Sequence, residues 1–106
     1  MANSMIRIDD SGWLDLGILC KYRRKNGIVT VRIYASLALT SDWATKGTLP
    51  AGYRPSEVVF QGGFSLGSGS VNVAFLINPS GAIQARLNAG ATGTTITTGA
   101  TISYPI

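Results

Sequence analysis

Apolar and polar residues alternate with a period of two over most of this chain, which is the pattern of strands that bury one face. The clearest stretch is 28–39, where every second residue from Val29 onward is apolar. Residues 13–25 alternate in the same way, with apolar positions at Leu14, Leu16, Ile18 and Cys20. No segment has a convincing helical pattern. These two segments are therefore predicted to be neighbouring strands.

The dipeptide Asn26-Gly27 between the two segments predicts how they pair. It is the strongest short signal for a hairpin, because a type I′ turn needs positive φ at both central residues. With these residues in the loop, Tyr22 and the other apolar residues share one side, and Cys20 is expected to be an inert core residue. The predicted facing pairs are Lys25–Ile28, Cys20–Ile33, Ile18–Ala35 and Leu16–Leu37.

Basic residues gather on the opposite side of this hairpin. The same register places Lys21 directly across from Arg32, with Arg23 and Lys25 beside them. Facing like charges are destabilising unless a carboxylate or a ligand lies between them. One interpretation is a solvated face, balanced by a neighbouring subunit or by the carboxylates of Asp9, Asp10 or Asp15. The other is contact with an anionic group, such as a phosphate- or carboxylate-bearing glycan.

The remainder of the chain is predicted to form further short strands and turns. Residues 41–47 break the alternation and are expected to be a loop, and residues 48–55 form a corner that two prolines stiffen. Strands are expected at 57–61, 71–77, 82–87 and 96–106, separated by a Gly/Ser-rich connection (61–70), an Asn-Pro-Ser-Gly turn (78–81) and a low-complexity stretch (88–95).

About six strands with frequent turns predict an all-β fold, an antiparallel β-sandwich or jelly-roll-like barrel. The 106 residues suffice for one domain, which we expect over residues 13–106. Residues 1–12 show no clear periodicity and are expected to be a linker or a cloning remnant, so that the domain is the end of a longer protein. No apolar run approaches the ~18 residues of a membrane helix and the start lacks a signal-peptide pattern, so membrane insertion is not expected.

The composition argues against enzyme chemistry. Histidine is absent and Cys20 is the single cysteine, which excludes a histidine-containing triad, an imidazole metal site and an intrachain disulfide. A glycosidase needs two carboxylates about 5–9 Å apart, and none of the five acidic residues makes a recognisable pair. We therefore expect no catalytic residue, no bound metal and no cofactor.

Two places carry candidate ligand residues. Trp43 stands in a loop beside Asp42, where an aromatic ring and a carboxylate would suit a sugar, although packing or an interface would also explain the ring. On the basic face, Tyr34 lies near Arg32. Nucleic acid fits that face less well, because the only aromatic residue within the basic run, Tyr22, lies on the apolar side. The candidate ligand residues are Trp43, Asp42, Arg32, Tyr34, Lys21 and Arg23.

Two other sets of residues are interpreted as structural. Tyr53 and Arg54 lie in the stiff corner, where the ring is expected to pack and the guanidinium to hold carbonyl groups or Glu57. Trp13 is expected to cover a sheet end or another subunit. A strand face of uncharged polar residues lacks the charged side chains that keep strand edges from pairing with other chains. Other subunits could therefore cover such a face, or it could simply be solvated. The residues of such a face are Thr95, Thr97, Thr101 and Ser103.

Four segments occur in an order that carries a resemblance: Trp13-Leu14-Asp15-Leu16, Tyr22-Arg23-Arg24-Lys25, Leu49-Pro50-Ala51-Gly52-Tyr53-Arg54-Pro55 and Ile77-Asn78-Pro79-Ser80-Gly81-Ala82-Ile83. Together they resemble the C-terminal head domain of bacteriophage tail fibre and minor tail structural proteins, over about residues 13–106. The LPxGYRP corner is the most distinctive of them. The Gly/Thr-rich stretch after Asn88 departs from the family pattern.

The resemblance implies a β-sandwich head at the tip of a long fibre, assembled as a homotrimer and often used to touch the host cell surface. The family has no shared catalytic motif, and its loops vary, so no ligand residue is carried over. We therefore expect a virion tail-fibre tip that binds a host cell-envelope carbohydrate as a homotrimer. The alternatives are a trimerising cap that binds no receptor, a lectin-like adhesin, or a domain of a bacteriocin tail.

Overall fold

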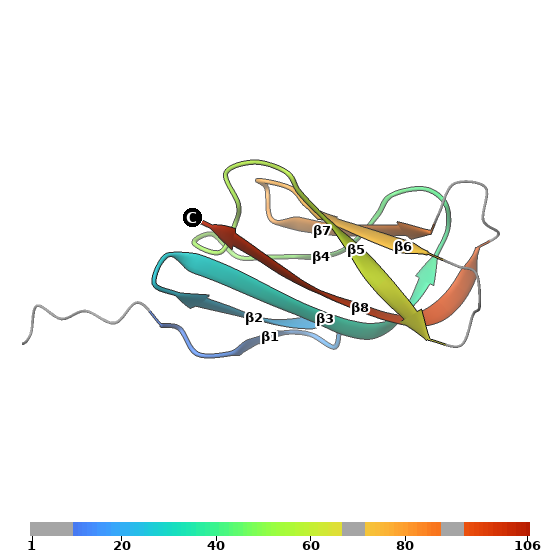
Figure 1. Cartoon of the computed structure of the whole chain (residues 1–106), viewed down its shortest axis with the longest axis horizontal. Helices are drawn as coiled ribbons and strands as arrows, with labels where there is room; N and C mark the ends of the chain where they lie inside the picture. Colours follow the sequence, from blue (N-terminus) through green and yellow to red (C-terminus); the bar gives the residue numbers. More distant parts are fainter. Residues whose placement is uncertain (1–9, 67–71, 88–92) are drawn as a thin grey trace, which may run out of the picture.

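The computed structural model describes residues 10–66, 72–87 and 93–106, which form eight strands (Figure 1). The strands are β1 (Leu14–Leu16), β2 (Cys20–Lys25), β3 (Ile28–Leu39), β4 (Ala44–Thr48), β5 (Val59–Leu66), β6 (Val73–Ile77), β7 (Ala82–Leu87) and β8 (Thr94–Pro105). Among the described residues, no helix is long and apolar enough to cross a membrane. The predicted division at residue 12 stays a prediction, since residues 1–9 lie outside the described part.

All strands pair antiparallel in the order β1-β2-β3-β8-β5-β6-β7-β4, and this sheet folds over into two layers. The layers meet in β5, whose residues 59–63 pair with β6 while residues 64–66 pair with β8. On the other side, β4 approaches the β1–β2 turn, where Leu19 and Leu16 lie against Gly47. The predicted all-β antiparallel sandwich is confirmed, and it is nearly closed into a barrel.

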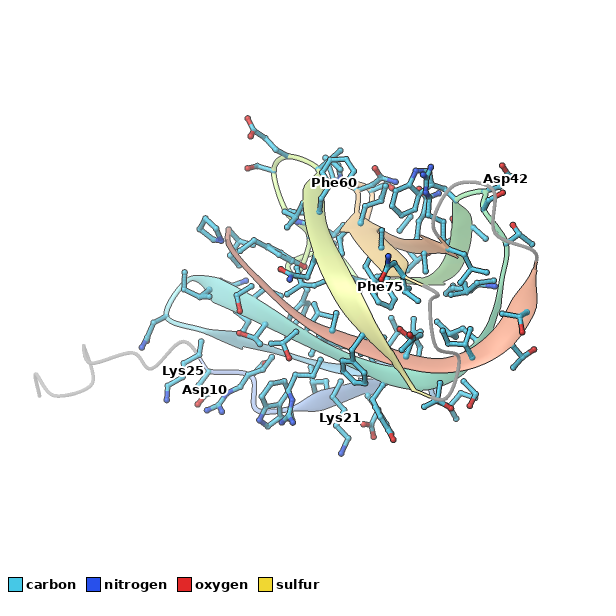
Figure 2. All side chains as sticks on the ribbon, turned by 45° about the vertical axis from the view of Figure 1, so that its right-hand side comes forward. Asp10, Lys21, Lys25, Asp42, Phe60 and Phe75 are labelled. Carbon is cyan, nitrogen blue, oxygen red and sulfur yellow. The ribbon has the colours of Figure 1, made fainter. Side chains whose placement is uncertain are left out.

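The core fills the space between the layers. Each core strand contributes every second residue, as its alternating sequence dictates. Figure 2 shows Phe75 of β6 inside the molecule. The largest fully buried side chains are those of Phe75, Leu39, Leu49, Ile77, Ile83, Leu87, Ile102, Val29, Val31 and Thr98. Burial of the apolar side chains among them stabilises the fold, and the hydroxyl of Thr98 donates a hydrogen bond to the Phe64 carbonyl.

The Asn26-Gly27 hairpin is confirmed close to its turn and is wrong further away. Both turn residues have positive φ, and β2 pairs with β3 from Lys25–Ile28 to Cys20–Ile33. Beyond Cys20 the chain does not continue along β3, because Gly17, with φ of 58°, reverses it into a second hairpin with β1. The expected pairs Ile18–Ala35 and Leu16–Leu37 therefore do not form: Leu16 faces Cys20, and Ile18 is 93% exposed.

Two further segments differ from the expectation. Residues 41–47 were predicted to be a loop, but Ala44–Thr48 is an edge strand that pairs with β7 across a bulge. The strand predicted at 57–61 begins at Val59 and runs to Leu66, because Gly63 lets β5 cross directly over the ring of Phe75. Residues 61–66, which were predicted to belong to the Gly/Ser-rich connection, are thus part of β5. Val71 and residues 67–70 and 88–92 lie outside the described residues.

The LPxGYRP corner is a packed structural element. The Leu49 amide donates to the Gly81 carbonyl at 2.9 Å, and Arg54 Nε donates to the Leu49 carbonyl at 2.8 Å, so the corner is joined to the β6–β7 turn. The Tyr53 ring packs edge-on against Tyr22 with centroids 4.9 Å apart. The structural roles expected of Tyr53 and Arg54 are confirmed, with a carbonyl as the partner of the guanidinium.

Candidate functional site

The outer face of the layer β1-β2-β3-β8 carries the basic residues. The register places Asp15, Lys21, Arg32 and Thr101 in one row across the four strands, and the pairing of Lys21 with Arg32 is as predicted. The next row towards the Asn26-Gly27 turn holds Arg23, Thr30 and Ser103. In Figure 2, Lys21, Lys25 and Asp10 lie along this outer side of the molecule. We call this surface the basic face.

A hollow of about 550 Å³ opens on the basic face. It exists because the chain turns back at Gly17, so that β1 and the β1–β2 turn flank the row of charges. The turn brings the almost fully exposed side chain of Ile18 to the rim, and β3 supplies Tyr34, which is 63% exposed. The lining residues are Asp15, Gly17, Ile18, Cys20, Lys21, Arg32 and Tyr34.

Arg23 is bound within the chain. Its Nε and terminal nitrogen donate to the two carboxylate oxygens of Asp10 at 2.9 and 2.6 Å, a bidentate ion pair. The hydrogen bonds from Arg23 and then from the Gly12 amide lower the pKa of Asp10 from its ordinary 3.8 to about 2. Of the carboxylates expected to balance the basic residues, Asp10 thus pairs with Arg23, while Asp9 lies outside the described residues.

This ion pair predicts a specific pH dependence. A carboxyl group with a lowered folded-state pKa stabilises the fold above its unfolded-state pKa, near 3.8, and this contribution is lost as the pH falls through about 2. We expect Asp10→Asn to lower the urea midpoint slightly at pH 7 and to differ less from wild type at pH 2. Asp42→Asn, in the connection between β3 and β4, controls for net charge. If Asp10→Asn lowered the urea midpoint by the same amount at pH 7 and at pH 2, the stabilising role of this ion pair would be contradicted.

The indole ring of Trp13 lies against two basic side chains. The ring centroid of Trp13 lies 5.6 Å from Cζ of Arg32 and 5.8 Å from Cζ of Arg23, so the indole contacts both side chains. A second hollow of about 370 Å³ continues along the basic face and is lined by Trp13, Arg23, Lys25, Asn26, Ile28 and Thr30. Trp13 therefore lines the second hollow and contacts Arg32, which lines the first.

Trp43 and Asp42 lie elsewhere, next to the outer face of the layer β4-β7-β6-β5. The Trp43 ring is contacted by Arg86, whose Cζ is 5.3 Å from the centroid, and by Phe60 at 6.4 Å between centroids. Phe60 is 67% exposed. Figure 2 shows Asp42 and Phe60 on the side of the molecule away from Lys21. The six candidate residues therefore form two separate groups.

The sequence missed several residues that lie at the hollow or beside the Trp43 ring. It assigned Ile18 to the core, whereas the turn at Gly17 places it at the rim of the hollow. It interpreted Asp15 only as a carboxylate that balances the basic residues. Phe64, whose ring lies 6.3 Å from that of Tyr34, and Arg86 were not considered. The glycine within an apolar run was the available signal for the turn, because glycine adopts positive φ without strain.

Two further expectations concern inert parts of this layer. Cys20 is buried, and desolvation raises the pKa of its thiol to about 11, in agreement with a core role. The polar face of β8 contacts β3: Thr97 shares a hydrogen bond with Ser36 at 3.0 Å, and Ser103 with Thr30 at 3.1 Å. Whether other subunits also cover Thr95 and Thr101 stays a prediction.

Comparison with known proteins supports the fold. No protein-family model and no curated protein sequence matches the chain. Eleven chains among the solved structures do match. One is the head domain of phage bIL170, from work on the receptor-binding domains of lactococcal phages. The match has a TM-score of 0.67 and 22% identity, and it covers 90% of this chain and 97% of that one. The resemblance to phage head domains is confirmed as a shared fold.

Proposed function

We propose that this chain is a head domain of a phage or prophage tail fibre, which attaches the virion to a host cell surface by binding an envelope carbohydrate. It acts at the fibre tip, as a homotrimer and without catalysis. The observation that carries this proposal is the fold, which is shared over 90% of the chain with the head domain of phage bIL170. Fold alone does not determine function, so the surface must also suit the task.

The surface suits a carbohydrate. Sugar sites combine an aromatic ring, which packs against the apolar face of the sugar, with charged or polar groups that bind the hydroxyls. The hollow on the basic face offers Tyr34 together with Asp15, Lys21 and Arg32. Both aromatic and polar side chains are therefore present at one solvent-open site.

A glycan array tests carbohydrate binding. We expect the fluorescently labelled chain to bind a limited set of bacterial glycans, and Arg32→Gln to bind them more weakly. Arg86→Gln, which removes one positive charge from the other layer, serves as the matched control. A folded wild-type chain that binds no glycan would favour the alternative of a trimerising cap.

The homotrimer is supported by exposed apolar side chains and by the benefit of multivalency. Phe60 of β5 and Val58, just before that strand, leave apolar surface in contact with solvent, which contact between copies would remove. Three weak sites acting together raise the avidity for a repetitive cell surface. Light scattering is expected to give three times 11.1 kDa, and a stable monomer would contradict the trimer.

A further inference from the structure

Two positive charges lie side by side on the basic face. Lys21 and Arg32 face each other on β2 and β3, where Cβ atoms of facing residues are about 4.5–5.5 Å apart. Within the described residues no salt bridge joins either one to a carboxylate, since Asp10 is held by Arg23. Both side chains are exposed. An anion between them would remove the repulsion and gain two charge-assisted hydrogen bonds.

The surroundings of this charge pair select what kind of anion fits. Ile18 and Tyr34 give the hollow an apolar and an aromatic side, which a small inorganic ion would leave unused. Asp15 lies in the same row as the two cations and accepts hydrogen bonds, so it suits the hydroxyl groups of a sugar. The hollow thus combines groups for an oxyanion, for sugar hydroxyls and for the apolar face of a sugar ring.

We propose that the hollow lined by Asp15, Ile18, Lys21, Arg32 and Tyr34 binds a negatively charged sugar, with its phosphate or carboxylate group between Lys21 and Arg32. This inference rests on the proposed carbohydrate attachment and names the class of glycan that would be bound. It assigns the binding to the basic face and leaves Trp43 and Asp42 outside the site.

Two aromatic contacts hold the site in a defined geometry before any ligand arrives. Trp13 contacts the guanidinium of Arg32, and Phe64 contacts the ring of Tyr34. Because the planar guanidinium forms two parallel hydrogen bonds to phosphate or carboxylate oxygens, its orientation matters more than that of the lysine ammonium. Trp13 and Phe64 are therefore positioning residues, and less side-chain freedom is lost on binding.

The test is an NMR titration of the folded chain with three probes: glucose 1-phosphate, glucuronate and uncharged glucose. We expect shifts at the Arg32 side chain and at the Ile18 and Tyr34 amides, with glucose at least about tenfold weaker than the better of the two anionic sugars. Inorganic phosphate is added as a fourth probe, and it should bind more weakly than glucose 1-phosphate because it leaves Tyr34 and Ile18 unused. Comparing glucose 1-phosphate with glucuronate shows which anionic group is preferred.

Two variants and one control make the result specific. Lys21→Gln and Arg32→Gln should each weaken binding of the preferred anionic sugar about tenfold, and Lys21→Gln should leave the melting temperature equal or slightly higher, because it relieves a repulsion. Arg86→Gln carries the same change in net charge on the other layer and should bind like wild type. Loss of binding together with retained stability distinguishes a ligand site from a structural role.

Several results would overturn the inference. The first is equal affinity for glucose and for both anionic sugars, and the second is unchanged binding in both variants. The others are an equal loss of affinity in Arg86→Gln, and NMR shifts confined to Trp43 and its neighbours. The glycan array distinguishes failure of the anionic sugar site from failure of the proposed carbohydrate attachment. A wild-type chain that binds only uncharged glycans on the array, with both variants unaffected, would keep carbohydrate attachment and remove the anionic site.

Discussion

Replacing Gly81 with alanine is expected to lower the free energy of unfolding by about 3 kcal/mol, because backbone strain and overpacking each cost about 1–3 kcal/mol. Gly81 is buried and has a φ of 90°, which alanine adopts only with strain. A Cβ at this position would lie 2.5 Å from the Leu49 carbonyl oxygen and 2.7 Å from Arg54 Nε. The substitution therefore pushes apart the hydrogen bonds that join the LPxGYRP corner to the β6–β7 turn.

Urea denaturation measures this loss, and Gly17→Ala is its matched control. Gly17 also has positive φ, but a Cβ there would meet no atom within 4 Å. Its substitution should cost about 1–2 kcal/mol, the price of a left-handed conformation alone. Equal losses in the two variants would show that the packing of the corner contributes nothing beyond backbone conformation.

Gly99→Ala is expected to destabilise the fold by about 2–3 kcal/mol, in the upper part of the range of about 1–3 kcal/mol for overpacking. Gly99 of β8 is buried beneath the ring of Phe64, and a Cβ there would overlap the Ile33 carbonyl oxygen and lie 2.7 Å from Phe64 Cζ. Relief of these overlaps requires the ring of Phe64 to move, and Phe64 contacts Tyr34 at the hollow. The substitution should therefore also disturb the NMR signals of Tyr34.

Gly62→Ala controls for this second prediction. Gly62 is exposed on β5, and a Cβ there would meet nothing within 4 Å, so the free energy of unfolding should change by no more than about 0.5 kcal/mol. Thermal and urea unfolding of the two variants are compared with wild type. If Gly99→Ala were as stable as Gly62→Ala, the close packing of the Phe64 ring and the Ile33 carbonyl against Gly99 would be contradicted.

Local signals in the sequence predicted much of the fold. The Asn26-Gly27 turn and the alternation on both sides of it determined the β2–β3 register, since a shift by one residue would expose the whole apolar set. The turn 78–81 and the inward positions of Ile83, Ala85 and Leu87 were predicted for the same reason and are confirmed.

The sequence could not predict features that depend on distant contacts. The strand β4 has a bulge and little alternation, and it exists because β7 offers an unpaired edge. The extension of β5 to Leu66 depends on pairing with β8, which lies about thirty residues later in the chain. The turn at Gly17 was hidden because Leu14, Leu16, Ile18 and Cys20 maintain the alternation through it.

The candidate site was predicted in part. The basic face and its residues Lys21, Arg32 and Tyr34 follow from the hairpin register alone, which is why the sequence found them. The hollow beside them arises from the β1–β2 turn, which the sequence did not predict. Trp43 was placed in a loop correctly, but only the folded arrangement separates it from the basic face and brings Arg86 onto its ring.

The most direct test of the central claim, attachment to a host surface, is co-sedimentation of the folded chain with cell envelopes from a panel of bacteria. We predict saturable retention on the envelopes of a few strains, with Arg86→Gln retained like wild type. Absence of retention on every envelope, by a chain whose circular dichroism shows the intact all-β fold, would contradict the account.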